Sequence, residues 1–63
     1  MLQGIVQFYL LDKQYGYIRV DGSLEEIYFS GKNSNIIFCK GDRVSFTIKE
    51  DKHGLTATGV IKI

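Results

Sequence analysis

Apolar and polar residues alternate in short runs along this chain, and a turn signal separates the runs about every ten residues. Alternation with a period of two residues is typical of β-strands that bury one face. No segment has the sustained 3.6-residue apolar period of an amphipathic helix. The pattern therefore predicts an all-β protein with strands at residues 3–10, 14–21, 25–30, 42–50 and 54–62.

The second and third predicted strands carry aromatic residues on one face only. Period two places Tyr15, Tyr17 and Arg19 together, opposite an aliphatic face. In the same way it places Tyr28 with Ser30 on the next strand. If the two strands are neighbours, these residues form an exposed flat surface of phenol rings beside a guanidinium group. Such a surface suits unpaired nucleobases, which stack on aromatic rings whatever their sequence.

The inward positions of the five strands define a candidate core. The first strand has apolar residues at both parities, which indicates either burial on both sides or a β-bulge at which the strand changes faces. Phe8 can accordingly be a core or a surface residue. The predicted core consists of Val6, Ile18, Val20, Ile27, Phe29, Val44, Phe46, Ile48 and Val60.

The longest connection, residues 31–41, begins with polar residues and continues with an apolar run. That run, Ile36 to Phe38, is too apolar to be wholly solvated. We expect Phe38 to anchor the loop or to cap an open end of a barrel, and not to stack on a ligand. Short strands without a helix, joined by such turns, predict a small barrel or sandwich.

Length and composition narrow the functional class. A chain of 63 residues forms one domain, 1–63, with one small core. Its single cysteine, Cys39, forms no internal disulfide, which favours a reducing, cytoplasmic location. No apolar run has the length of a membrane span, so we expect no membrane partner. The one histidine, His53, has no nucleophile or acid at a catalytic spacing. We therefore expect no enzymatic activity, cofactor, metal or small-molecule substrate.

The net charge is +1, from eight basic and seven acidic residues, so the chain lacks the strong basic excess of many nucleic-acid-binding domains. A cationic face on this protein therefore requires an uneven distribution of the charged side chains. The basic and amide side chains that could lie on the aromatic face are Gln7, Lys13, Arg19 and Lys32, and the acidic ones that we expect at its rims or behind it are Glu25, Glu26, Glu50 and Asp51.

Six segments, in order, carry a family resemblance. GIVQFY at 4–9 and DKQYGYI at 12–18 resemble the opening Gly-x-Val-Lys-Trp-Phe and Lys-Gly-Phe/Tyr-Gly-Phe-Ile of the bacterial cold-shock proteins. The segments at 21–22, 27–30, 41–46 and 54–60 are similar to that family's Asp-Gly turn, Val-Phe-Val-His, Gly-x-x-Val-x-Phe and Gly-Pro-x-Ala-x-x-Val. The chain thus resembles a divergent cold-shock domain.

The resemblance implies a five-stranded antiparallel OB-type barrel that binds single-stranded RNA or DNA. It matches Phe8 to the surface tryptophan of the family, three tyrosines to its stacking aromatics and Lys13 to a phosphate-contacting lysine. It also implies that Phe8 lies outside, because the first strand bends. The candidate nucleic-acid-binding residues are Phe8, Lys13, Tyr15, Tyr17, Arg19, Tyr28 and Ser30.

The chain departs from the family at several positions of this surface. Gln7 stands where the family has lysine, and Ser30 where it has histidine. Gly31 stands where another surface aromatic is usual, and Gln14 replaces a glycine. One charge, one imidazole and one ring of the family's surface are therefore absent.

Two functions are consistent with these residues. The first is a module that binds single-stranded nucleic acid, as an RNA chaperone or a regulator of expression, in a monomer or weak homodimer. The second is a protein-interaction or self-associating module, since tyrosine-rich surfaces serve protein interfaces equally well. The near-neutral charge favours the second, and the ordered motifs favour the first.

Overall fold

The computed structural model describes residues 1–32, 36–52 and 54–63, and it contains five strands in those ranges. Each strand agrees with its predicted range to within one residue at both ends. No helix in the described residues is long and apolar enough to cross a membrane. The strands are β1 (Leu2–Leu10), β2 (Tyr15–Val20), β3 (Glu26–Ser30), β4 (Arg43–Asp51) and β5 (Gly54–Lys62).

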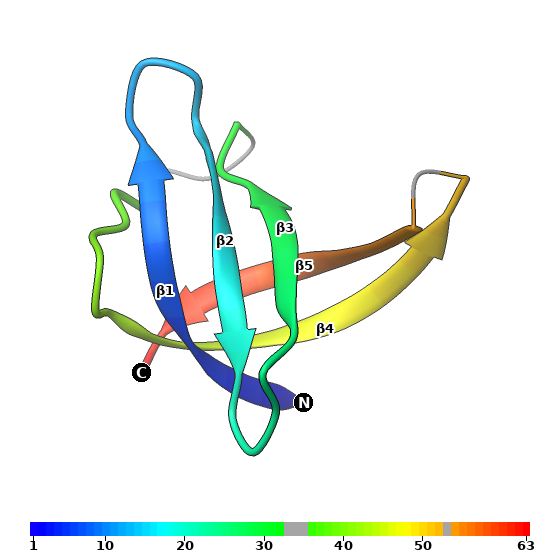
Figure 1. Ribbon diagram of the computed structural model, residues 1–63. Coiled ribbons are helices and arrows are strands. Elements are labelled where there is room, and N and C mark those ends of the chain that lie inside the picture. The colour runs from blue at the N-terminus through cyan, green and yellow to red at the C-terminus, as the bar shows by residue number, and fades with distance from the viewer. Residues whose placement is uncertain (33–35, 53) are drawn as a thin grey trace.

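The strands close into a barrel in the order β1-β2-β3-β5-β4. β1, β2 and β3 lie side by side, and the β4–β5 hairpin crosses behind them and projects past β3 (Figure 1). The predicted all-β barrel of OB type is confirmed. Four of the pairings are antiparallel, whereas β3 and β5 are parallel. An odd number of strands cannot form a closed ring in which every neighbour is antiparallel, so this otherwise antiparallel barrel closes through one parallel pairing.

A β-bulge in β1 decides which of its side chains enter the core. Val6 lies opposite Ile18 and Phe8 opposite Tyr17, so Gln7 is an extra residue in β1. A bulge of this kind lets two residues of equal parity point to opposite faces. Val6 is accordingly buried, whereas Phe8 is 39% exposed. Of the two possibilities for this strand, the change of face is confirmed.

Gly16 lets β1 and β2 approach closely beneath the aromatic residues. A Cβ atom at this position would collide with the backbone carbonyl oxygen of Phe8. Because backbone atoms cannot move aside as the end of a side chain can, any other residue would force the two strands apart. Gly16 thus sets the distance between Phe8 and the neighbouring Tyr17.

The core confirms most of the predicted residues and corrects one. Val20 and Val60 are partly buried against the core, but Ile48 is 38% exposed. β1 pairs with β4 only from Arg43 to Phe46, so Ile48 lies where the hairpin has already left β1. The buried apolar residues are Val6, Ile18, Ile27, Phe29, Phe38, Val44, Phe46 and Ala57.

Phe38 belongs to the core although it lies in the long connection. Its side chain is 3% exposed. Its ring centroid lies 5.2 Å from that of Phe29 and 5.6 Å from that of Tyr9, in edge-to-face geometry with both. The connection therefore delivers an aromatic anchor into the barrel, as its apolar run predicts.

Candidate functional site

Four aromatic side chains form one continuous cluster on the outside of β1, β2 and β3. We call Phe8, Tyr15, Tyr17 and Tyr28 the ring face. Ring centroids are 5.4 Å apart for Phe8 and Tyr17, 6.0 Å for Tyr17 and Tyr28, and 5.7 Å for Tyr28 and Tyr15. Phe8 and Tyr28 are exposed, and the other two rings are half-buried. The predicted side-by-side arrangement of the tyrosines, with Phe8 at its edge, is confirmed, but Tyr15 and Tyr17 are less exposed than we expected.

Strand register is the cause of this arrangement. Phe8 lies opposite Tyr17 on β2, and Tyr17 lies opposite Tyr28 on β3. Residues directly opposite each other project from the same face, with Cβ atoms about 4.5–5.5 Å apart. The three rings therefore form a row across the strands, and Tyr15 packs beside its end.

The ring face is not flat. Neighbouring ring planes are inclined by 36° for Phe8 and Tyr17, by 80° for Tyr17 and Tyr28, and by 30° for Tyr28 and Tyr15. The flat platform that we expected from strand alternation is thus wrong, because edge-to-face contacts are a favourable geometry for neighbouring rings. The surface presents separate tilted ring faces, which can each receive one base but cannot carry a coplanar stack.

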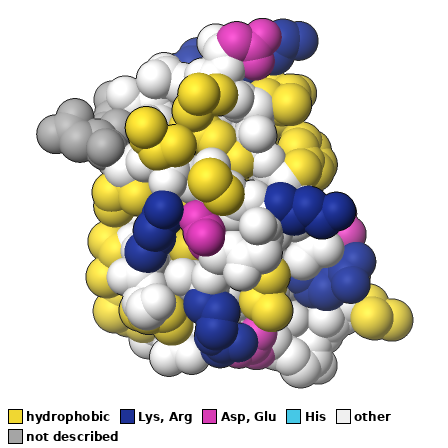
Figure 2. Space-filling model, turned by 90° about the vertical axis from the view of Figure 1, so that its left-hand side faces the viewer, with side chains coloured by type: hydrophobic (Ala, Val, Ile, Leu, Met, Phe, Trp, Pro, Cys, Tyr) yellow, Lys and Arg dark blue, Asp and Glu magenta, His cyan; other side chains and the backbone are white. Residues whose placement is uncertain are grey.

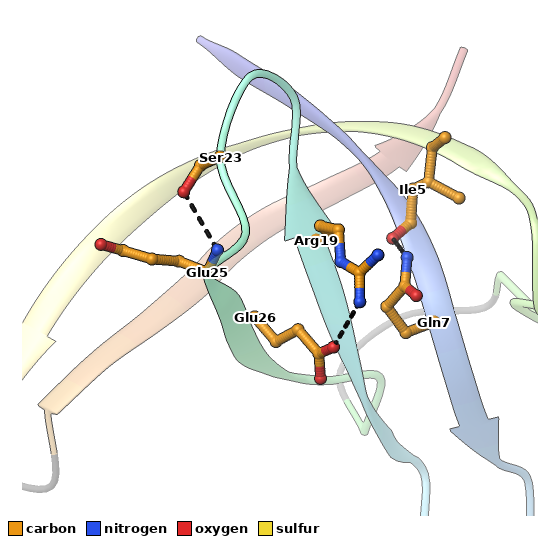
Figure 3. A network of polar contacts seen from close by, with 6 residues as sticks. All are labelled: Ile5, Gln7, Arg19, Ser23, Glu25 and Glu26. Atoms are coloured by element: carbon orange, nitrogen blue, oxygen red, sulfur yellow. Dashed lines mark hydrogen bonds and ion pairs between the residues drawn. The ribbon is translucent and has the colours of Figure 1, made fainter.

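Arg19 lies on the same outer face but is engaged in an ion pair. Its Nη2 donates to Oε2 of Glu26 at 3.0 Å (Figure 3). Glu26 is the residue opposite Arg19 in the β2–β3 pairing and the first residue of β3, so it lies on the outer face at the rim of the ring face. The signal was present in the sequence, since Glu26 precedes Tyr28 by two residues and shares its parity.

The other cations near the ring face are spread apart. Lys13 is exposed in the β1–β2 turn, and neither it nor Lys32 forms an ion pair with a side chain in the described ranges. Figure 2 shows one side of the molecule, on which lysine and arginine side chains are separated by acidic and uncharged ones. Lys13 and Lys32 are therefore single exposed cations, and the side drawn in Figure 2 has no broad basic patch.

Gln7 and Ser30, the positions that differ from the cold-shock pattern, make local contacts. The Gln7 side-chain amide donates from Nε2 to the backbone oxygen of Ile5 at 3.1 Å (Figure 3). Ser30 lies opposite Tyr15 at the end of β3, and its Oγ accepts from the backbone N–H of Lys32 at 3.3 Å. Both side chains thus stabilise backbone at the margins of the ring face.

Gly31 has a structural reason to lack a side chain. It is buried, and a Cβ atom there would collide with the phenol oxygen of Tyr9. The Tyr9 ring points inward and packs at 5.6 Å from Phe29 in a stacked arrangement. The hydroxyl group of Tyr9 therefore occupies the space through which an aromatic side chain at position 31 would leave the backbone.

The described residues bring aromatic side chains together on the outer face, and not metal-ligating ones. Within residues 1–32, 36–52 and 54–63, no group of three or more His, Cys, Asp or Glu side chains could hold a metal ion. His53, which we considered catalytically inert, lies outside the described residues. No protein-family model matches the chain, and no curated protein matches it. The argument for function therefore depends on the geometry of the ring face and on the motifs in the sequence.

Proposed function

We propose that this protein binds single-stranded RNA or DNA by stacking unpaired bases on the ring face. The observation that carries the proposal is the unbroken contact of four partly exposed rings, from Phe8 through Tyr17 and Tyr28 to Tyr15. Such rings on a sheet bind bases without reading their sequence, because every base has a flat face. The ordered resemblance to the bacterial cold-shock proteins supports the same ligand class.

The small number of unpaired cations favours a moderate affinity for nucleic acid. Stacking contributes about 1–3 kcal/mol for each base. Arg19 is already paired with Glu26, and Lys13 is a single exposed cation in the turn that precedes Tyr15. With few phosphate contacts, the affinity depends only weakly on salt concentration. A sequence-tolerant binder of this kind suits a small cytoplasmic RNA chaperone or a regulator of expression, with a preference for pyrimidine stretches that unstack easily.

The second candidate is a module whose ring face binds a protein or a second copy of the chain in a weak homodimer. The ion pair between Arg19 and Glu26 favours it, because a carboxylate on the face repels phosphate groups. Tyrosine and arginine side chains are also enriched in protein interfaces. This module has no catalytic role under either proposal.

Tyrosine fluorescence separates the two candidates, since the chain has four tyrosines and no tryptophan. The protein is titrated with oligo-dT and oligo-dA at low and at moderate salt. Nucleic-acid binding predicts saturable quenching that is stronger with oligo-dT and falls only gradually with salt. Absence of quenching by any oligonucleotide at low salt, with the fold verified by circular dichroism, would remove the first candidate.

A further inference from the structure

The row of residues that contains the rings continues beyond β3. Tyr28 lies opposite Thr56 on β5, and Thr56 lies opposite Lys49 on β4. Together with Phe8 and Tyr17, these residues form one row across all five strands of the barrel. With a strand spacing of about 4.8 Å, the row is about 19 Å long. Its first three members are aromatic, and its last two are a hydroxyl and an ammonium group.

The burial of neighbouring residues confirms that the row lies outside. Phe29 and Ala57 follow Tyr28 and Thr56, are paired with each other, and are 0% and 3% exposed. Since successive side chains alternate between faces, Tyr28 and Thr56 both point outward. Lys49 is paired with Thr56 and therefore projects from the same face.

Thr47 and Thr58, the neighbouring outward pair on the β4–β5 hairpin, form a hydrogen bond with each other. Their hydroxyl groups lie 2.9 Å apart. Thr56 and Lys49, two residues farther toward the hairpin turn, have no side-chain hydrogen bond or ion pair within the described residues. Their polar groups are thus available to a ligand.

Lys49 differs in this respect from the other cations of the five strands, since each of them forms an ion pair: Arg19, Arg43 and Lys62. Arg19 is neutralised by Glu26, whereas Lys49 is exposed and forms no ion pair with a described side chain. A lysine ammonium group is a compact charge that contacts phosphate without a fixed geometry. At the end of a stacking row, it is suited to hold the backbone of a strand whose bases lie on the rings.

We propose that Thr56 and Lys49 extend the binding surface onto the β4–β5 hairpin. The base on Tyr28 is followed by a phosphate group that Lys49 holds and to which the Thr56 hydroxyl donates. The nucleic acid then crosses the barrel strands in the direction of the row. This inference rests on the proposed function, and it adds a phosphate contact at the opposite end of the row from Phe8.

The test compares two lysines of the hairpin by tyrosine quenching with oligo-dT between 50 and 200 mM salt. Lys49→Gln and Lys62→Gln remove the same charge, but Lys62 is paired with Asp42 near the other end of the hairpin, with N and O atoms 3.2 Å apart. One lost phosphate contact reduces the slope of log affinity against log salt by about 0.7 for a single strand. We expect this reduction for Lys49→Gln and the wild-type slope for Lys62→Gln.

Two further variants keep the test informative. Lys49→Arg keeps the charge and retains the wild-type slope. Thr56→Val keeps the branched shape, weakens binding and leaves the slope unchanged, because it removes a hydroxyl group and no cation. Circular dichroism verifies that each variant is folded.

The outcomes separate this inference from the proposal on which it rests. If wild-type protein shows no quenching, the proposed function is wrong and this surface has no nucleic-acid ligand. Another outcome is that wild-type protein binds and Tyr28→Ala weakens binding, but Lys49→Gln and Lys62→Gln both keep the wild-type slope. Binding of nucleic acid by the ring face is then supported. The extension to the hairpin is then wrong.

Discussion

Tyr28 and Phe29 are neighbours in the sequence, yet they lie on opposite sides of the barrel wall. Phe29 is 0% exposed and contacts Tyr9 and Phe38, whereas Tyr28 is 37% exposed and contacts rings of the outer face. The two side chains differ by one hydroxyl group, so their chemistry alone does not separate their roles. Strand alternation places one ring in the core and leaves the other exposed on the outer face.

The same division applies to all eight aromatic residues of the chain. A fully buried phenylalanine contributes several kcal/mol to folding because its removal leaves a cavity. An outer ring pair contributes only about 0.5–1.5 kcal/mol. The inner set is Tyr9, Phe29, Phe38 and Phe46, and the outer set is Phe8, Tyr15, Tyr17 and Tyr28.

The largest effect is expected from Phe46→Ala. Phe46 is 0% exposed, and truncation of such a ring costs about 3–5 kcal/mol. That cost approaches the whole stability of a domain this small, so thermal melting by circular dichroism should find the variant largely unfolded. Phe8→Ala is the matched control, since the same change on the outer face should leave a cooperative transition. A melt of Phe46→Ala close to wild type would show that this ring is not part of the core.

For Tyr28→Ala we expect mainly a loss of binding, in contrast to the loss of stability expected for Phe46→Ala. The variant should stay folded, with a loss of stability of about 1 kcal/mol from its ring contacts. Its affinity for oligo-dT should fall by about 1–3 kcal/mol, because one stacking surface is gone. Tyr28→Phe keeps the ring and should bind nearly as wild type, as measured by titration calorimetry. Equal affinities of Tyr28→Ala and wild type would remove this ring from the binding surface.

A gain of stability is expected from Gln14→Gly. Gln14 has a φ of 57°, in the left-handed region, at the turn that leads into Tyr15. That conformation costs an L-residue about 1–2 kcal/mol, and glycine avoids it but loses about 0.5–1 kcal/mol through its larger unfolded-state entropy. We expect a net gain of about 0.5–1 kcal/mol in urea denaturation. A decrease in the denaturation midpoint would contradict the strain at this position.

The smallest effect concerns Asp42 and acid pH. The backbone N–H of Cys39, followed by the hydrogen bond from Lys62, lowers the pKa of the Asp42 carboxyl group below 3.8. A lowered folded-state pKa means that this stabilisation is fully present above the unfolded-state value and is lost as the pH falls through the folded-state value. The difference in stability between wild type and Asp42→Asn, measured by urea denaturation, should therefore shrink below about pH 4. A difference that is unchanged between pH 7 and pH 2 would show that folding does not lower the pKa of Asp42.

The fold could be predicted from the sequence because its signals are local. The alternation of apolar and polar residues correctly predicted which faces of β2 and β3 are buried. The apolar residues at both parities of β1 indicated that a bulge was possible there, and the structure has one at Gln7. Ile48 was wrongly assigned to the core because alternation continues along β4 after β1 has ended beside it. How far one strand covers another depends on tertiary pairing, which no local pattern contains.

The site was only partly predictable for the same reason. The ring face joins consecutive strands, so parity was sufficient to find it. Thr56 and Lys49 join it through the parallel β3–β5 pairing, between strands that are distant in the sequence. Their register cannot be read from a hairpin turn, and neither residue belongs to an aromatic pattern that would have drawn attention to it.

The division between inner and outer rings can be measured in one nuclear magnetic resonance titration with oligo-dT. The four tyrosines give separate ring resonances, and three of them belong to the ring face, whereas Tyr9 packs against the core. Stacking bases should shift the resonances of Tyr15, Tyr17 and Tyr28 strongly and saturably, while those of Tyr9 stay almost unchanged. Unshifted outer rings at saturating oligo-dT, or a shift of Tyr9 as large as theirs, would contradict recognition by the outer face.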